Sequence, residues 1–205
     1  MAEQPNLIPR IAVRSIATGM LMMAVFTLMW SGIAYGSLDH GLPVLIIASL
    51  IGLTFIANAV YLFKISKRFP DLESEADKAE GKRTGKWFGI IFGAEGLVIF
   101  IAVNTVINMG YADLTISVIA LVVGLHFYPL AKVFKRKIDY YLATWTTLIA
   151  ICGIVLILRK TYPVKDVDAF VGIGTAIATT CYGTYMMISG WKLEKPEPAD
   201  LKASA

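Results

Sequence analysis

The sequence predicts an all-α membrane protein with six transmembrane helices and both ends of the chain on the cytoplasmic side. Hydrophobic residues make up 57% of the 205 residues and the mean hydropathy is +0.66, whereas soluble domains are about 45–50% apolar. The apolar residues are gathered into six long blocks. The basic residues lie almost entirely beside the connections that a six-span chain would place on one side.

Each block is suited to crossing a bilayer as a helix. About 20 apolar residues cover the ~30 Å of hydrocarbon, and a chain in lipid must satisfy its own backbone hydrogen bonds. None of the blocks alternates in polarity as the strands of a membrane barrel do. The spans are expected at about 11–35, 41–63, 87–109, 114–131, 138–158 and 167–190.

The distribution of charge predicts the orientation. Of the nineteen Lys and Arg residues, only Arg159, Lys160 and Lys165 fall on one side of a six-span chain. By the positive-inside rule the other side is the cytoplasm. The net charge of +4 then indicates contact with anionic lipid at the cytoplasmic face. A nucleic-acid partner is not expected.

The first span follows Arg10 and Arg14 and could imitate a secretion signal. Its apolar run is longer than the ~7–15 residues of a signal peptide, which favours an uncleaved span. We expect residues 1–191 to form a single six-helix transmembrane domain and residues 192–205 to be a disordered cytoplasmic tail.

The cytoplasmic connection over 64–86 is the largest segment between spans, and it is rich in charged residues. It could form a short helix, with Asp71 as N-cap and Gly81 closing its end. Its composition favours a solvated linker over that alternative.

Glu95, in the third span, is the residue that most needs an explanation. It lies nine residues beyond Lys86, which places it ~13 Å into the bilayer. A carboxylate at that depth is neutral, has a partner, or lines a wet cavity. Arg14, near the end of the first span, can instead extend to the interface as an anchor.

Three glycines mark another face of the third span. Gly85, Gly89 and Gly93 are spaced by four and form a smooth surface for close helix packing. Glu95 lies about 160° away from Gly93 on a helical wheel. Because neither face should meet lipid, the third helix is expected at the centre of the bundle.

The fourth span contains His126, six residues before Lys132 and thus ~9 Å from the same face. Since a tight turn joins the third and fourth spans, we expect His126 to meet Glu95. Pro129 cannot donate to the carbonyl four residues back, so a kinked fourth helix is predicted. The pair is either a proton relay or solute-binding pair, or a structural hydrogen bond between helices.

Small and polar residues recur along the sixth span. Gly172, Ala176 and Thr180 form a ladder that is more typical of a packing seam than of a pathway. Other polar or special residues are expected to support the Glu95–His126 pair. They are Asn58, Asn104, Tyr128, Pro129 and Arg14.

No cofactor or metal is expected. Cys152 and Cys181 fall at different depths of their spans, which argues against a disulfide. No Cys/His cluster is present, and His40 lies in an outer loop, too far from His126 to share a haem. The sequence also contains no P-loop, GxSxG or HExxH motif.

Two stretches carry a resemblance. GLHFYPLA at 124–131 resembles a Gly-Leu-His-Phe-x-Pro-Leu-Ala stretch of small, functionally uncharacterised bacterial membrane proteins of about this length. FGAEGLVIF at 92–100 is similar to the glutamate-bearing helix of the same group. The resemblance implies a polytopic bacterial membrane protein, and it implies no substrate or activity. We expect the chain to lie in the cell (inner) membrane as a multi-pass protein.

Three classes of function remain. The favoured hypothesis is a small transporter or channel-like protein that binds a proton or small polar solute at Glu95 and His126. Six spans are few for a transporter, which makes a homodimer plausible. The alternative is a non-transporting sensor, assembly factor or lipid-binding module. An enzyme is not expected, because a Glu/His pair without a nucleophile or metal names no reaction.

Overall fold

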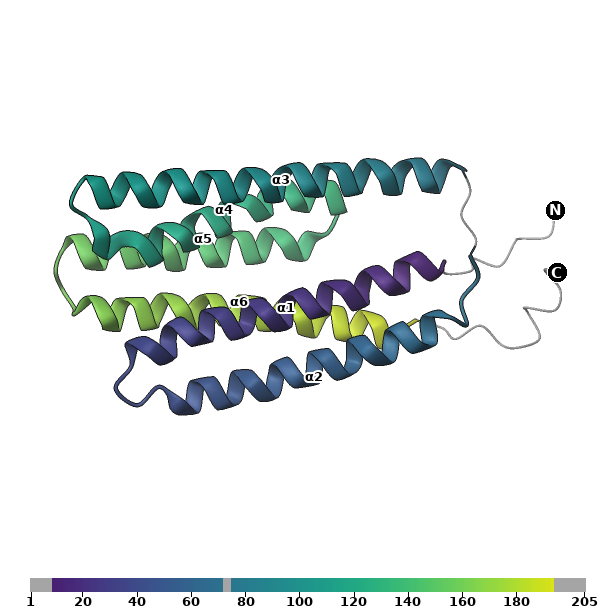
Figure 1. Ribbon diagram of the computed structural model, residues 1–205, viewed down its shortest axis with the longest axis horizontal. Helices are drawn as coiled ribbons and strands as arrows, with labels where there is room; N and C mark the ends of the chain where they lie inside the picture. The colour runs from purple at the N-terminus through teal and green to yellow at the C-terminus, as the bar shows by residue number, and fades with distance from the viewer. Residues whose placement is uncertain (1–8, 72–74, 194–205) are drawn as a thin grey trace.

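The computed structural model describes residues 9–71 and 75–193. Within these residues it contains six long α-helices, one short 3-10 helix and no strand, which confirms the all-α prediction. The elements are α1 (Arg10–Ser37), α2 (Leu42–Ser66), α3 (Glu75–Asn108), η1 (Ala112–Leu114), α4 (Thr115–Phe134), α5 (Lys137–Leu158) and α6 (Val164–Trp191). They run up and down beside one another in an elongated bundle (Figure 1).

Five of the helices have the length and apolarity to cross a membrane, namely α1, α2, α3 from Gly81 onward, α4 together with η1, and α5. The chain therefore has the helices of a multi-pass membrane protein. Large apolar side chains cover the outside of the bundle, where Leu50, Leu53 and Phe100 are each more than 60% exposed. In water such a surface would be costly, whereas in a bilayer it faces lipid.

α6 is as long as α1, at 28 residues, but is not among these five helices. Its sequence is diluted by glycine and threonine and begins with the charged residues Lys165, Asp166 and Asp168. Its position explains that composition. α6 packs along α1 and also touches α5, α4 and α2, so that protein rather than lipid covers much of it.

Small residues let α6 approach its neighbours closely. A side chain at Gly172 would collide with the carbonyl oxygen of Trp30, 2.9 Å from the position of its Cβ. A side chain at Gly183 would likewise collide with the ring of Phe55. The hydroxyls of Thr27 and Thr179 are 2.8 Å apart across the α1–α6 contact. The packing seam predicted for the sixth span is thus present.

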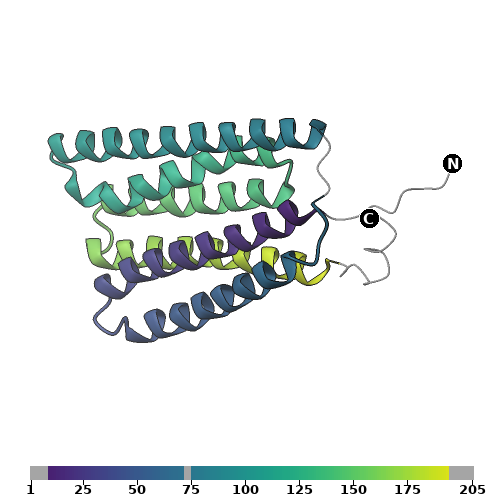
Figure 2. The same ribbon diagram turned by 45° about the vertical axis from the view of Figure 1, so that its right-hand side comes forward.

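The expectation that the third helix is central is wrong. α3 packs substantially only against α4 and the adjoining η1, and no residue of its apolar stretch is buried. It stays on the outer edge of the bundle in both views (Figures 1 and 2). A Cβ at Gly85, Gly89 or Gly93 would meet no atom within 4 Å in the described chain. Regularly spaced glycines show that another helix can pack closely against this one. They do not show that the other helix belongs to the same chain.

The prediction of a solvated linker over 64–86 is also wrong for most of that segment. α3 begins at Glu75 and continues unbroken through Gly81, so that Gly81 ends no helix. Glutamate, alanine and lysine are good helix formers, and extending an existing helix requires no new nucleus. Asp71 lies four residues before Glu75, and its carboxylate accepts a hydrogen bond from Arg10.

The remaining helix ends differ from the predicted ends by at most three residues, as at Val164 against 167. The start of α1, the end of α2, the start of α3, the α4–α5 turn and the end of α6 lie at the same end of the bundle (Figure 1), and we call this the basic end. There the backbone N–H of Arg10 donates to Pro70 at 3.0 Å. The predicted tail lies outside the described residues from 194 onward.

Candidate functional site

Glu95 and His126 meet, as the sequence predicts. The Nδ1 atom of His126 lies 3.1 Å from Oε1 of Glu95, and their side chains are 10% and 9% exposed. α3 supplies the carboxylate and α4 the imidazole. The two helices are antiparallel neighbours because only the short turn through η1 connects them. Similar depth and adjacency in the chain are thus sufficient to bring these side chains together.

The direction of the contact differs from that of a formed hydrogen bond. Although the distance is short, Nδ1 of His126 makes no properly directed hydrogen bond to any described residue. Nδ1 therefore keeps unused hydrogen-bonding capacity. Buried polar atoms in that state commonly have water or a ligand as partner.

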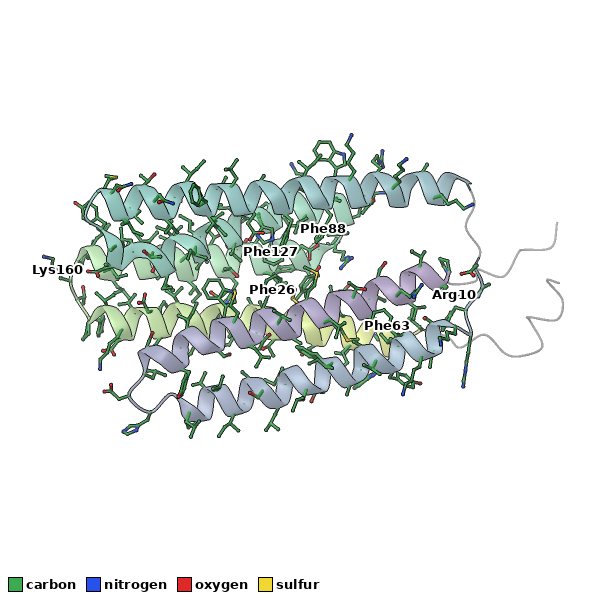
Figure 3. All side chains as sticks on the ribbon, in the orientation of Figure 1. Arg10, Phe26, Phe63, Phe88, Phe127 and Lys160 are labelled. Carbon is green, nitrogen blue, oxygen red and sulfur yellow. The ribbon has the colours of Figure 1, made fainter. Side chains whose placement is uncertain are left out.

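The pair lies in the wall of a cleft of about 1170 Å³ between α1, α3, α4 and α6, with a smaller contribution from α5. Most of the lining is apolar and rich in aromatic and methionine side chains. Phe26, Phe88 and Phe127 gather between α1 and the α3–α4 pair (Figure 3). An apolar cleft with a few convergent polar groups is the usual form of a small-molecule site.

A bridge of aromatic rings crosses the cleft one turn from Glu95, on the side of the basic end. Phe92 of α3 meets the edge of His126 at 6.5 Å between ring centroids. It also lies 6.5 Å from Phe26 of α1 and 5.6 Å from Phe88. The Glu95–His126 pair lies beyond these rings, and we call the part of the cleft between the rings and the basic end the basic half.

Thr146 of α5 also faces the cleft, and the sequence analysis did not identify it. It is 1% exposed, and its Oγ1 has no hydrogen-bond partner among the described residues. Thr175, by contrast, donates to the backbone carbonyl of Val171. Threonine in membrane helices usually bonds to its own backbone in this way. In the stretch "ATWTTL" at 143–148, Thr144 does so, whereas the hydroxyls of Thr146 and Thr147 have no partner among the described residues, and nothing in the sequence distinguishes them.

A second polar cluster near the basic end was also missed. Asp139, two residues into α5, is completely buried. Neither of its carboxylate oxygens has a hydrogen-bond partner among the described residues. Arg136, three residues earlier, donates to the Tyr182 hydroxyl of α6 at 3.0 Å. An aspartate so near a helix end is expected to be wet, and nothing in the local sequence indicates that this one is buried.

Three of the expected supporting residues lie elsewhere. Asn58 accepts a hydrogen bond from the indole N–H of Trp191 at 2.9 Å and so connects α2 to the end of α6. Asn104 donates to a carbonyl of its own helix and is exposed. The hydroxyl of Tyr128 lies 3.0 Å from that of Thr144 on α5. None of the three lines the cleft, because each lies on a different face of its helix from the site.

Of the remaining two, only Arg14 lines the cleft, at its basic end. Pro129 is exposed on α4, which continues through it to Phe134. The proline does not end the helix, and the kink stays a prediction. α4 closes at Lys135, which adopts the left-handed conformation with φ 55°.

The described residues contain no group of three or more His, Cys, Asp and Glu residues placed to hold a metal ion. Searches with protein-family models, among curated proteins and among solved structures each find no match. What the site does must therefore be argued from its geometry.

Proposed function

We propose that this protein is a small transporter or channel-like protein in which Glu95 and His126 bind a proton or small polar solute. The observation that carries the proposal is the position of the pair. It lines a cleft of about 1170 Å³ instead of being sealed between two packed helices. Ionisable residues inside membrane proteins that face a cavity typically mark an ion or proton path.

The chemistry of the pair suits a proton. A carboxylic acid beside a neutral imidazole and a carboxylate beside an imidazolium carry the same net charge. A proton can therefore pass between Glu95 and His126 without changing the charge of the site. A proton that enters or leaves changes that charge by one unit, which is costly in a surrounding of low dielectric constant. That cost couples proton exchange to a polar solute or to a rearrangement of the walls.

The orientation and the sixth span belong to the same proposal. We assign the basic end to the cytoplasm of a bacterial cell, with the chain in the inner membrane. α6 becomes the sixth span, since 28 residues measure ~42 Å as a helix and its neighbours shield its polar groups. Two copies would pair through the part of the glycine face of α3 that does not line the cleft, around Gly93.

Proton flux into liposomes that contain the purified protein and an enclosed pH-sensitive dye tests the proposal. We expect Glu95→Gln to reduce the flux to that of protein-free liposomes, because glutamine cannot release a proton. Asp166→Asn is the matched control, since it removes an exposed carboxylate at the opposite end of the bundle. Wild-type flux equal to that of protein-free liposomes, or full flux in Glu95→Gln, would contradict the proposal.

The alternative is a non-transporting membrane protein in which the pair is a structural contact. One observation favours it: α3 packs substantially only against α4, so this contact could hold α3 in place. In that case liposomes with the wild-type protein would show only background proton permeability. Glu95→Gln would lower the thermal unfolding temperature. Unchanged unfolding in this variant would count against the alternative.

A further inference from the structure

We propose that the basic half of the cleft binds one acyl chain of an anionic phospholipid from the leaflet at the basic end, with Arg14 holding the phosphate. This site is separate from the Glu95–His126 pair. It does not depend on whether the protein transports a proton.

The side chains that line the cleft on α1 and on α3 keep a large exposed fraction. Ile11 and Met29 of α1 line it and are 55% and 46% exposed. Phe92 of α3 lines it and is 39% exposed. Gly81 and Gly85, on α3 near the basic end, contribute no side chain to the wall, and a Cβ added at either would meet no atom of another described element within 4 Å. A hydrocarbon chain can therefore enter sideways between α1 and α3.

The length of the basic half matches one leaflet. Arg14 and Phe26 are twelve residues apart on α1, which corresponds to ~18 Å along a helix. One leaflet contributes about half of the ~30 Å of hydrocarbon. A chain whose headgroup lies at Arg14 would thus end near the Phe26–Phe92 bridge, short of the buried pair.

The charges at the mouth select an anion. Arg14, Lys135 and Arg136 all line the cleft, while Glu95, the only acidic residue of the lining, lies beyond the aromatic bridge. Arg136 is already engaged by Tyr182 and lies over the ring of Phe134. The guanidinium of Arg14 makes no ion pair with an acid of the described residues.

The apolar walls of the cleft, together with the cations at its opening, favour a lipid over a soluble anion. Guanidinium groups bind phosphate through paired, charge-assisted hydrogen bonds. Met22, Phe63 and Phe88 line the cleft near that mouth and offer apolar contact that only a hydrocarbon chain can use. A soluble phosphate would gain the first interaction and leave the apolar walls exposed.

Native mass spectrometry of the protein in detergent, titrated with phosphatidylglycerol or phosphatidylcholine of identical chains, measures the binding. We expect the wild type to prefer phosphatidylglycerol, and Arg14→Gln to weaken that preference about tenfold, as loss of a charge-assisted hydrogen bond implies. Lys64→Gln is the matched control, because it removes an exposed cation at the same end that does not line the cleft. Equal binding of the two lipids by the wild type, or an equal effect of both variants, would overturn the proposal.

A second pair of variants tests the acyl chain. Gly85→Phe places a ring in the cleft and is expected to abolish retention of both lipids. Gly89→Phe is its control, since Gly89 has the same open surroundings but does not line the cleft. Thermal unfolding of both variants shows whether they fold alike. Equal lipid retention by two folded variants, or displacement of bound phosphatidylglycerol by soluble glycerol phosphate, would refute binding through the acyl chain.

Discussion

The contact between α1 and α6 and the edge formed by α3 use the same residue type in opposite ways. The glycines of α6 lie against backbone and rings of neighbouring helices, whereas the glycines of α3 lie against nothing in the described chain. Because lipid is as apolar as a side chain, helices in a membrane associate through close packing and hydrogen bonds and not through the hydrophobic effect. α6 uses both, while α3 leaves space, and the cleft occupies that space.

This comparison explains why the candidate site lies where it does. Against the tightly packed surface of α6, a buried ionisable pair would be sealed from any solute. On the loosely attached α3, Glu95 is buried by the cleft walls and still adjoins a space that a ligand can occupy. Loose packing on one side of the bundle is therefore what gives the pair access.

The largest difference in stability is expected when a glycine on α6 and a glycine on α3 are each replaced by leucine. Gly172→Leu forces a side chain against the backbone of Trp30 and Ala34 and should destabilise the protein by ~3 kcal/mol or more, the upper range for overpacking. Gly93→Leu has open space and should change stability by less than about 1 kcal/mol, the difference in helix propensity. Thermal unfolding in detergent measures both.

Similar losses in the two variants would contradict the comparison. They would mean that the face of α3 is occupied, by a second copy of the chain or by another partner. A cross-linking measurement on the Gly93→Leu protein would then show whether a dimer has been lost. A large loss of stability in Gly172→Leu, with little change in Gly93→Leu, would support the conclusion that no other part of the chain covers this face of α3.

A smaller effect is expected from the hydroxyl pair at the same contact. Thr27→Val removes the hydrogen bond to Thr179, whose oxygens are 2.8 Å apart, and should cost about 0.6–1.7 kcal/mol, the range found for hydrogen bonds between membrane helices. Thr18→Val is the control, because Thr18 donates only to its own helix and is exposed. Equal unfolding temperatures for the two variants would show that close packing alone holds α1 to α6.

The sequence was sufficient for the features that depend on local patterns. Block lengths predicted the helices, and depth along the chain predicted that His126 meets Glu95. The outer position of α3 was not predictable, because a glycine face is equally consistent with a partner inside or outside the chain. Thr146 and Asp139 were missed for a related reason. Whether a hydroxyl or carboxylate is buried without a partner depends on which helix closes over it, and one sequence does not contain that information.

The smallest effect is expected at the end of the bundle opposite the basic end. Lys165 donates to Asp39 at 2.8 Å, and this hydrogen bond holds the pKa of the Asp39 carboxyl below its ordinary value of 3.8. The contribution of the pair to stability is therefore complete above that ordinary value and is lost as the pH falls through the lower pKa of the folded protein.

Both side chains are more than half exposed, and solvent-exposed ion pairs of this kind contribute little. We expect Asp39→Asn to leave the unfolding temperature at neutral pH almost unchanged and to remove only a slight decline below that pKa. A marked loss of stability at neutral pH would mean that this pair holds the α1–α2 connection to α6. The end opposite the basic end would then be packed as firmly as the contact between α1 and α6.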